Sequence, residues 1–172
     1  MMHALDRTAE LMTDEDIVEV TMHVGTILVA TDGSATAVEA TKVAISLAKR
    51  LGADLVALFV SPGNVEEPLE YEEMEQLEGI KHTSAGLEVA VKLGERNGVT
   101  VTPMRLEGAV GHEILQAAGE INAGMIVMGT EGRTGFKRFS LGSVAESVMK
   151  SSRIPVLVVR RGSTEFCMAP RA

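Results

Sequence analysis

The feature that most limits the possible folds is the stretch from Gly124 to Arg161. It contains two short apolar runs, Met125–Met128 and Val156–Val159, separated by a loop rich in glycine and basic residues and then by a helical pattern. Short apolar runs without alternation are typical of strands that are buried on both faces. The order strand, loop, helix, strand therefore predicts a parallel βαβ unit.

Three more apolar runs precede this unit and predict three more strands. The residues between them recur at the spacing of an amphipathic helix, and the first such helix should end at Gly52. Strands that alternate with helices predict a doubly wound α/β fold, a five-stranded parallel sheet with helices on both faces. Pro103 removes a ladder donor from the third strand, which favours an edge position. We expect these strands at Ile27–Ala30, Asp54–Val60 and Val99–Leu106, and the helix between the last two at residues 70–97.

The composition limits the kinds of partner. With 24 acidic residues against 16 Lys and Arg, the formal charge is −8, which argues against a nucleic-acid partner. The single cysteine, Cys167, cannot form an internal disulfide and fits a reducing compartment. No apolar run approaches the roughly 20 residues that a membrane-spanning helix needs. We therefore expect a cytoplasmic protein without a membrane partner.

The chain divides into an extension, a domain and a tail. Residues 1–24 show no clean helical or strand period and are interpreted as an N-terminal extension. Residues 25–161 carry all the predicted strands and form the domain, and residues 162–172 form a short C-terminal tail. The first helix of the domain has two alternative caps, Ser34 or a capping box of Thr36 with Glu39.

The loop after Gly129 has the chemistry of a phosphate-binding site. Gly129, Gly132, Gly142 and Ser143 fit the pattern G-x2-G-x9-G-S/T. Glycines let backbone amides approach an anion closely, and a helix that begins at Gly142-Ser143 offers unpaired N–H groups and the positive end of its dipole. Ser143 adds a hydroxyl donor and Arg133 a positive charge. The spacing favours phosphate binding, and the alternative is a flexible connection.

Three separated motifs resemble the universal stress protein family. They are the glycine loop, Thr31-Asp32-Gly33-Ser34 after the first strand, and Ile154–Val159 at the end of the domain. The resemblance covers residues 24–161, and the loop is similar to that of the ATP-binding branch of the family. It implies the strand order 3-2-1-4-5 and a homodimer formed through the last strand, Val156, Leu157, Val158 and Val159.

The resemblance also implies an adenine-nucleotide site. The glycines, Thr130, Arg133 and Ser143 would contact the phosphates of ATP. Asp32 would lie beside the ribose and phosphates, in part through Mg²⁺ or Mn²⁺, and Val60 would offer its backbone groups to the adenine edge. The implied site comprises Ala30, Thr31, Asp32, Val60, Met128, Gly129, Thr130, Gly132, Arg133, Gly142, Ser143 and Val144.

Several alternatives stay open at this point. Asp32 could simply cap the first helix. Glu131 departs from the family pattern, because a carboxylate inside the loop repels phosphate unless it points outward or meets a metal. No catalytic constellation emerges from the sequence. The leading hypothesis is therefore a regulatory protein that signals to an unknown protein partner through its nucleotide-dependent conformation and dimer surface. The alternatives are a slow ATPase or other nucleotide-using enzyme, and a dimerisation module without nucleotide binding.

Overall fold

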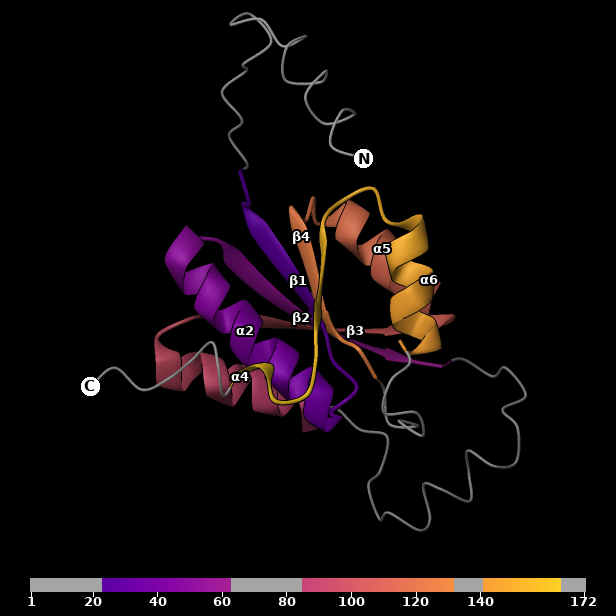
Figure 1. Cartoon of the computed structure of the whole chain (residues 1–172). Helices are drawn as coiled ribbons and strands as arrows, with labels where there is room; N and C mark the ends of the chain where they lie inside the picture. The colour runs from indigo at the N-terminus through magenta and orange to yellow at the C-terminus, as the bar shows by residue number, and fades with distance from the viewer. Residues whose placement is uncertain (1–22, 63–84, 132–140, 165–172) are drawn as a thin grey trace, which may run out of the picture.

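The structure, a computed structural model, describes residues 23–62, 85–131 and 141–164. Within these residues, five parallel strands form one sheet in the order β3-β2-β1-β4-β5 (Figure 1). This confirms both the predicted doubly wound fold and the strand order. The strands are β1 (Thr26–Ala30), β2 (Asp54–Ser61), β3 (Val101–Glu107), β4 (Met125–Gly129) and β5 (Val156–Val159).

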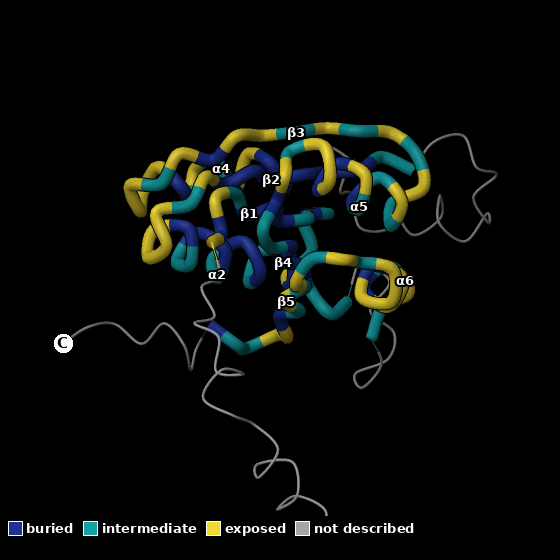
Figure 2. The backbone as a smooth tube through the Cα atoms, turned by 90° about the horizontal axis from the view of Figure 1, so that it is seen from above, coloured by how far each residue is buried: buried dark blue, intermediate teal, exposed yellow. Residues whose placement is uncertain are grey.

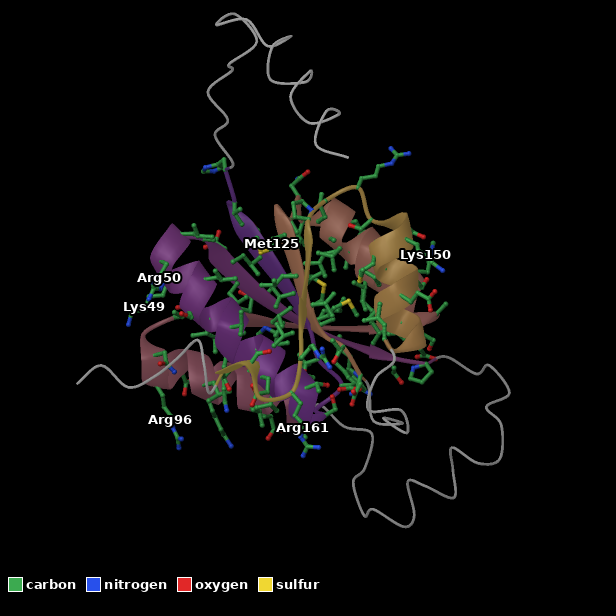
Figure 3. All side chains as sticks on the ribbon, in the orientation of Figure 1. Lys49, Arg50, Arg96, Met125, Lys150 and Arg161 are labelled. Atoms are coloured by element: carbon green, nitrogen blue, oxygen red, sulfur yellow. The ribbon has the colours of Figure 1, made fainter. Side chains whose placement is uncertain are left out.

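Helices cover both faces of the sheet. On one face lie α2 (Ala35–Leu51) and α4 (Ala85–Asn97), and on the other lie α5 (Val110–Glu120) and α6 (Ser143–Ser151) (Figure 1). Because side chains alternate along a strand, β1 sends Ile27 and Val29 into the first core and Leu28 into the second. All three are fully buried, as the continuous apolar run predicts for a central strand. The side chains of Lys49, Arg50, Arg96 and Arg161 point away from the sheet (Figure 3).

At the N-terminus of α2, the structure distinguishes between the two predicted caps. The Ser34 hydroxyl accepts a hydrogen bond from the Ala37 amide at 3.3 Å, so Ser34 is the cap. The capping box is wrong, since Thr36 lies inside the first turn and the Glu39 carboxylate binds another segment. At its other end the helix stops at Gly52, which has the left-handed conformation that glycine adopts without strain (φ 64°).

Glu39 instead holds the chain that follows β5. Its carboxylate accepts hydrogen bonds from the Thr164 hydroxyl at 2.6 Å and from the Thr164 amide at 3.0 Å. These bonds lower the pKa of Glu39, the hydroxyl bond being the larger cause. The start of the predicted C-terminal tail is therefore bound to α2.

The third strand begins later than predicted. The Val99 amide donates to the Gly94 carbonyl of α4 at 2.9 Å instead of pairing in the sheet, and β3 starts at Val101 rather than Val99. Its edge position, predicted from Pro103, is confirmed by the strand order. Seen from above, much of β3 is exposed while β1 and β2 are mostly buried (Figure 2).

Some predictions fall on residues outside the described part. The helix predicted for residues 70–97 is confirmed for Ala85–Asn97, and its first half lies outside the described residues. The same holds for most of the extension at 1–24 and for residues 165–172. In the part of the chain that the structure describes, no helix combines the length and the apolar character needed to cross a membrane.

Candidate functional site

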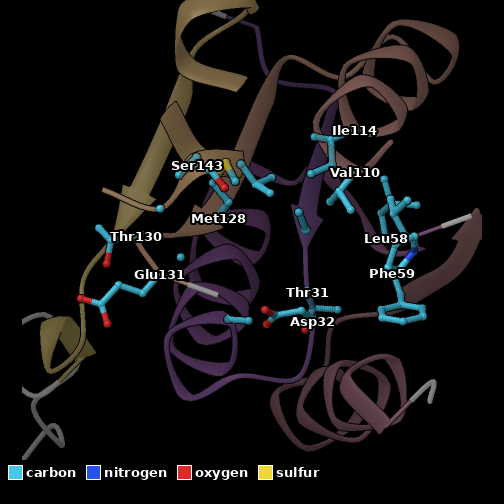
Figure 4. Close-up of a pocket in the computed structure, with 18 residues that line it drawn as sticks. Thr31, Asp32, Leu58, Phe59, Val110, Ile114, Met128, Thr130, Glu131 and Ser143 are labelled. Atoms are coloured by element: carbon cyan, nitrogen blue, oxygen red, sulfur yellow. The ribbon is translucent and has the colours of Figure 1, made fainter. Parts of the chain in front are cut away.

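A cavity opens at the carboxyl ends of β1 and β4, where the strand order reverses. The chain runs outward from β1 through β2 to β3 and then returns to the other side of β1. In doubly wound sheets this switch point forms a crevice that binds ligands. Here the crevice contains a cavity of about 250 Å³ (Figure 4).

The turn after β1 forms one wall of this cavity. The Thr31 amide still donates to the Leu58 carbonyl at 2.9 Å, and the chain then leaves the sheet. The Asp32 carboxylate accepts from the Ser34 amide at 2.9 Å, and the Thr31 hydroxyl accepts from the Gly33 amide at 3.3 Å. Gly33 has a positive φ of 79°, which suits glycine. Asp32 thus closes the turn, whereas Ser34 caps the helix.

The glycine loop is closed at its base. At the end of β4, the Thr130 amide donates to the Val159 carbonyl at 2.9 Å. The Thr130 carbonyl accepts from the Gly142 amide at 2.7 Å. The two ends of the loop therefore meet at the cavity, although they are separated in sequence.

Helix α6 begins at this closure without a side-chain cap. Gly142 is its N-cap residue, with φ −63° and ψ 152°, and as a glycine it has no side chain that could accept from the first turn. Uncapped N–H groups and the helix dipole make such an end attractive to anions. Gly142, Ser143 and Val144 all line the cavity, so this helix end faces the turn that holds Asp32.

The other end of the cavity is apolar. Leu58, Val110 and Ile114 lie together on the side opposite Thr130 and Glu131 (Figure 4). Val60 also lines the cavity. Because backbone groups along a strand alternate between its two neighbours, Val60 directs its N–H and C=O to the same side as Leu58, toward β1.

The pairing registers of the described strands show that the N–H and C=O groups of Val60 have no partner strand on the side of β1. Pairing of β1 with β2 ends at Ala30 and Leu58, before Val60 is reached. On the opposite side, the Ser61 carbonyl accepts from the Gly108 amide at 2.9 Å, which agrees with the alternation. The backbone of Val60 therefore faces the cavity beyond the end of β1.

The structure brings together most of the site residues predicted from the sequence. Gly132 and Arg133 lie outside the described residues. The others line the same cavity: Ala30, Thr31, Asp32, Val60, Met128, Gly129, Thr130, Gly142, Ser143 and Val144.

Sequence reasoning missed the lining residues from α5. The sequence predicts a loop at Val110 and a helix face that contains Ile114, whereas the structure has Val110 as the first residue of α5, four residues before Ile114. Both side chains line the cavity, and Ile114 is also buried in the second core. No signal in the sequence distinguishes the end of a core face from the wall of a cavity. Leu58 and Phe59, which lie on a predicted buried strand, were missed for the same reason, whereas Pro62 lies in a stretch that the sequence predicts as a surface excursion.

Glu131 lines the cavity but does not direct its charge into it. Its carboxylate is turned away from Asp32 and Ser143 (Figure 4). Its backbone carbonyl accepts a hydrogen bond from the Thr36 hydroxyl. Among the described residues, no group of three or more His, Cys, Asp or Glu side chains is placed to hold a metal ion.

Sequence comparison identifies close relatives. The family model described as "Universal stress protein family" matches residues 23–160. Universal stress protein MJ0531 of Methanocaldococcus jannaschii is 38% identical over 152 residues, which cover 81% of this chain and 84% of that protein. The match thus includes the whole sheet and both ends of the glycine loop.

Solved structures share the same architecture. Hypothetical protein MJ0577 is 31% identical with a TM-score of 0.64, and the match covers 82% of this chain and 98% of that one. A universal stress protein solved in complex with cAMP is 24% identical with a TM-score of 0.64, covers 81% of this chain and 99% of that one, and has the same fold. By its sequence relatives, its sheet order and the loop at its switch point, the chain belongs to the universal stress protein family.

Proposed function

We propose that this protein is a regulatory protein that binds ATP in the crevice between β1 and β4. The observation that carries the proposal is the closure of the glycine loop by the Thr130–Gly142 hydrogen bond. This bond places the uncapped start of α6 opposite Asp32, across one cavity. A triphosphate would receive hydrogen bonds from the amides of this helix end and from the Ser143 hydroxyl. Arg133 and Gly132 would add to these contacts from the loop.

The apolar end of the cavity would take the adenosine. Val60 can accept from the exocyclic amino group of adenine through its C=O and donate to a ring nitrogen through its N–H, because both groups face the same side. Val110, Ile114 and Met128 would pack against the ring and ribose. The complex of a related protein with cAMP supports an adenine nucleotide as ligand class.

Asp32 would supply the protein's carboxylate to a divalent cation that arrives with the phosphates. Mg²⁺ is commonly bound by one or two carboxylates together with phosphate oxygens and water. The described residues provide no complete metal site by themselves, which fits a cation carried by the nucleotide. Mn²⁺ would serve in the same position.

We infer a role in binding ATP rather than in hydrolysing it. A water that attacks phosphate must be oriented by a base within hydrogen-bond reach. The carboxylates that line the described cavity are Asp32, which accepts from the Ser34 amide, and Glu131, which is turned away from Asp32 and Ser143.

A regulatory role requires that ATP bind one conformation of the protein better than another, since only a difference in affinity shifts the populations of the two conformations. The single cysteine of the chain is consistent with a cytoplasmic setting.

Adding ATP with Mg²⁺ should stabilise the protein. A ligand at about 100 times its dissociation constant adds about 2.7 kcal/mol to the free energy of unfolding. For a chain of this size that corresponds to a rise in Tm of roughly 5–10 °C. Thermal unfolding followed by circular dichroism measures it. GTP is the matched control, because its base reverses the donor and acceptor that Val60 would meet; an equal rise with GTP would contradict the assignment of Val60 to the adenine edge.

We propose that β5 also forms a homodimer interface. It is an edge strand, and such strands invite pairing with another chain. Leu157 on this strand is 37% exposed, while Val156 and Val158 are half-buried against the second core. Leu157 is therefore the side chain of β5 that a partner can cover most.

Replacing Leu157 with lysine should convert the dimer to a monomer, because a partner strand would have to desolvate the new charge. Sedimentation equilibrium measures the change. Leu51→Lys is the control, since Leu51 is 50% exposed on α2, away from the sheet edge. A Leu157→Lys protein that remains a dimer, or a wild type that is already monomeric, would refute the interface.

A further inference from the structure

Thr36 connects two segments of the candidate site that are far apart in sequence. It lies in the first turn of α2 and is only 5% exposed. Its hydroxyl donates to the backbone carbonyl of Glu131, at the start of the glycine loop. A threonine deeper in a helix usually bonds its own helix, as Thr41 does with the Ala37 carbonyl at 2.8 Å. Thr36 stands too near the helix start for this, so its hydroxyl can hold the loop.

The end of β4 fits closely against the same side chain. A Cβ atom added at Gly129 would lie 2.8 Å from the Thr36 Oγ1 and 2.9 Å from its Cβ. Such distances are far shorter than ordinary van der Waals contacts. Gly129 is therefore required for the approach of β4 to Thr36.

Three backbone groups of Thr130 and Glu131, at the loop entry, form hydrogen bonds with three different segments of the chain. The Thr130 amide is bound to Val159 of β5, and the Thr130 carbonyl is bound to Gly142 before α6. The Glu131 carbonyl is bound to Thr36 of α2. The Thr36 hydroxyl also lies 3.4 Å from that of Ser34, the cap of α2.

Thr36 thereby joins the glycine loop to the turn that carries Asp32. The Ser34 amide donates to Asp32. The turn and the loop entry therefore belong to one hydrogen-bond network. Thr36 itself does not line the cavity. The structure also explains how a glutamate fits at position 131. Its backbone carbonyl binds Thr36, while its side chain is turned away from Asp32 and Ser143 (Figure 4).

We propose that Thr36 is a positioning residue, whose hydroxyl fixes the entry of the glycine loop relative to Asp32 and so sets the affinity for the nucleotide phosphates. The inference rests on the proposed function for its effect on affinity. Its effect on the loop entry can be measured without any ligand.

The test compares Thr36→Val, which removes the hydroxyl at nearly constant shape, with Thr36→Ser, which keeps it. Loss of one hydrogen bond should raise amide exchange at Thr130 and Gly142 about tenfold in the nucleotide-free protein, measured by NMR. Calorimetric titration with Mg²⁺ and ATP should show a three- to tenfold weaker affinity. The measured affinity falls in proportion to the fraction of molecules in which the loop entry is still held in place. Thr36→Ser should keep both values within about twofold of the wild type, because serine retains the hydroxyl that forms this hydrogen bond.

Thr41→Val is the matched control, because it also removes a buried threonine hydroxyl from α2 but one that bonds only within the helix. It should change neither exchange at Gly142 nor affinity. Unchanged exchange in Thr36→Val would overturn the inference, and so would unchanged affinity in a wild type that binds ATP. Equal losses in the serine and valine variants would show that the hydroxyl is not responsible. A wild type that binds no nucleotide refutes the proposed function, while the exchange data still decide whether Thr36 holds the loop.

Discussion

Replacing Gly142 with aspartate is expected to weaken ATP binding at least about 100-fold without lowering the stability of the protein. Gly142 is the N-cap residue of α6 and has the extended conformation that an aspartate cap adopts. The new carboxylate would accept from the amides of the first turn and interact well with the helix dipole. These are the groups that the triphosphate needs.

The loss of affinity follows from charge. Two unit charges 4 Å apart interact with about 4 kcal/mol at an effective dielectric constant of 20. After discounting for solvent screening, repulsion of about 2.8 kcal/mol remains, which corresponds to a factor of 100. Calorimetric titration measures the affinity, and thermal unfolding without nucleotide measures the stability.

Gly142→Asn is the matched control for this experiment. Asparagine has nearly the same shape and also caps helices, but it carries no charge. Its affinity should remain within about tenfold of the wild type, since it competes with phosphate only for neutral hydrogen bonds. Equal losses in the two variants would mean that the start of α6 does not face the phosphates.

Replacing Gly86 with alanine should weaken ATP binding about tenfold through the turn that carries Asp32. Gly86 is buried in the first turn of α4, and an added Cβ would lie 2.8 Å from both the Gly33 amide nitrogen and the Thr31 hydroxyl. The nitrogen belongs to the backbone, so the turn itself must shift. Overpacking typically costs 1–3 kcal/mol, of which about 1 kcal/mol is offset by the better helix propensity of alanine.

Gly94→Ala separates this effect from a general loss of stability. Gly94 lies on the same helix, but its added Cβ would meet Val101 and the Val99 carbonyl, both at 2.5 Å and next to β3. This variant should lose at least as much stability as Gly86→Ala, measured by urea unfolding, and bind ATP as the wild type does. If both variants lose affinity equally, the contact between α4 and the Asp32 turn has no specific role.

The fold could be predicted because its signals are local. Each apolar run in the sequence became a strand, and the alternation with helices determined the parallel sheet. Pro103 placed β3 at an edge, and Gly52 ended α2. The start of β3 was wrong because Val99 has a strand-like sequence but donates its amide to the end of α4. Only this hydrogen bond shows that Val99 precedes β3 instead of being part of it.

The candidate site was predictable where a motif carries it and hidden where tertiary contacts do. The turn at Asp32 and the loop ends at Gly129 and Gly142 are visible as glycine spacing. The roles of Thr36 and Gly86 are not, because each depends on a contact with a segment more than 50 residues away in sequence. Thr36 was interpreted from its neighbours as part of a capping box, and the structure uses its hydroxyl elsewhere.

Two glycines of the predicted loop pattern also have structural reasons that the sequence does not show. The loop glycines were expected to let backbone amides approach an anion, and Gly142 has a φ of −63° that any residue adopts. Gly129 is needed because Thr36 leaves no space for a side chain. A motif can thus identify the residue while the physical cause depends on packing that only the fold reveals.

The central claim is that the crevice between β1 and β4 binds ATP, and calorimetric titration of the wild type with Mg²⁺ and ATP tests it most directly. We predict saturable heat with one nucleotide per chain, lost in Gly142→Asp and kept in Gly94→Ala. Absence of heat at millimolar ATP, together with an unchanged Tm under the same conditions, would contradict the account.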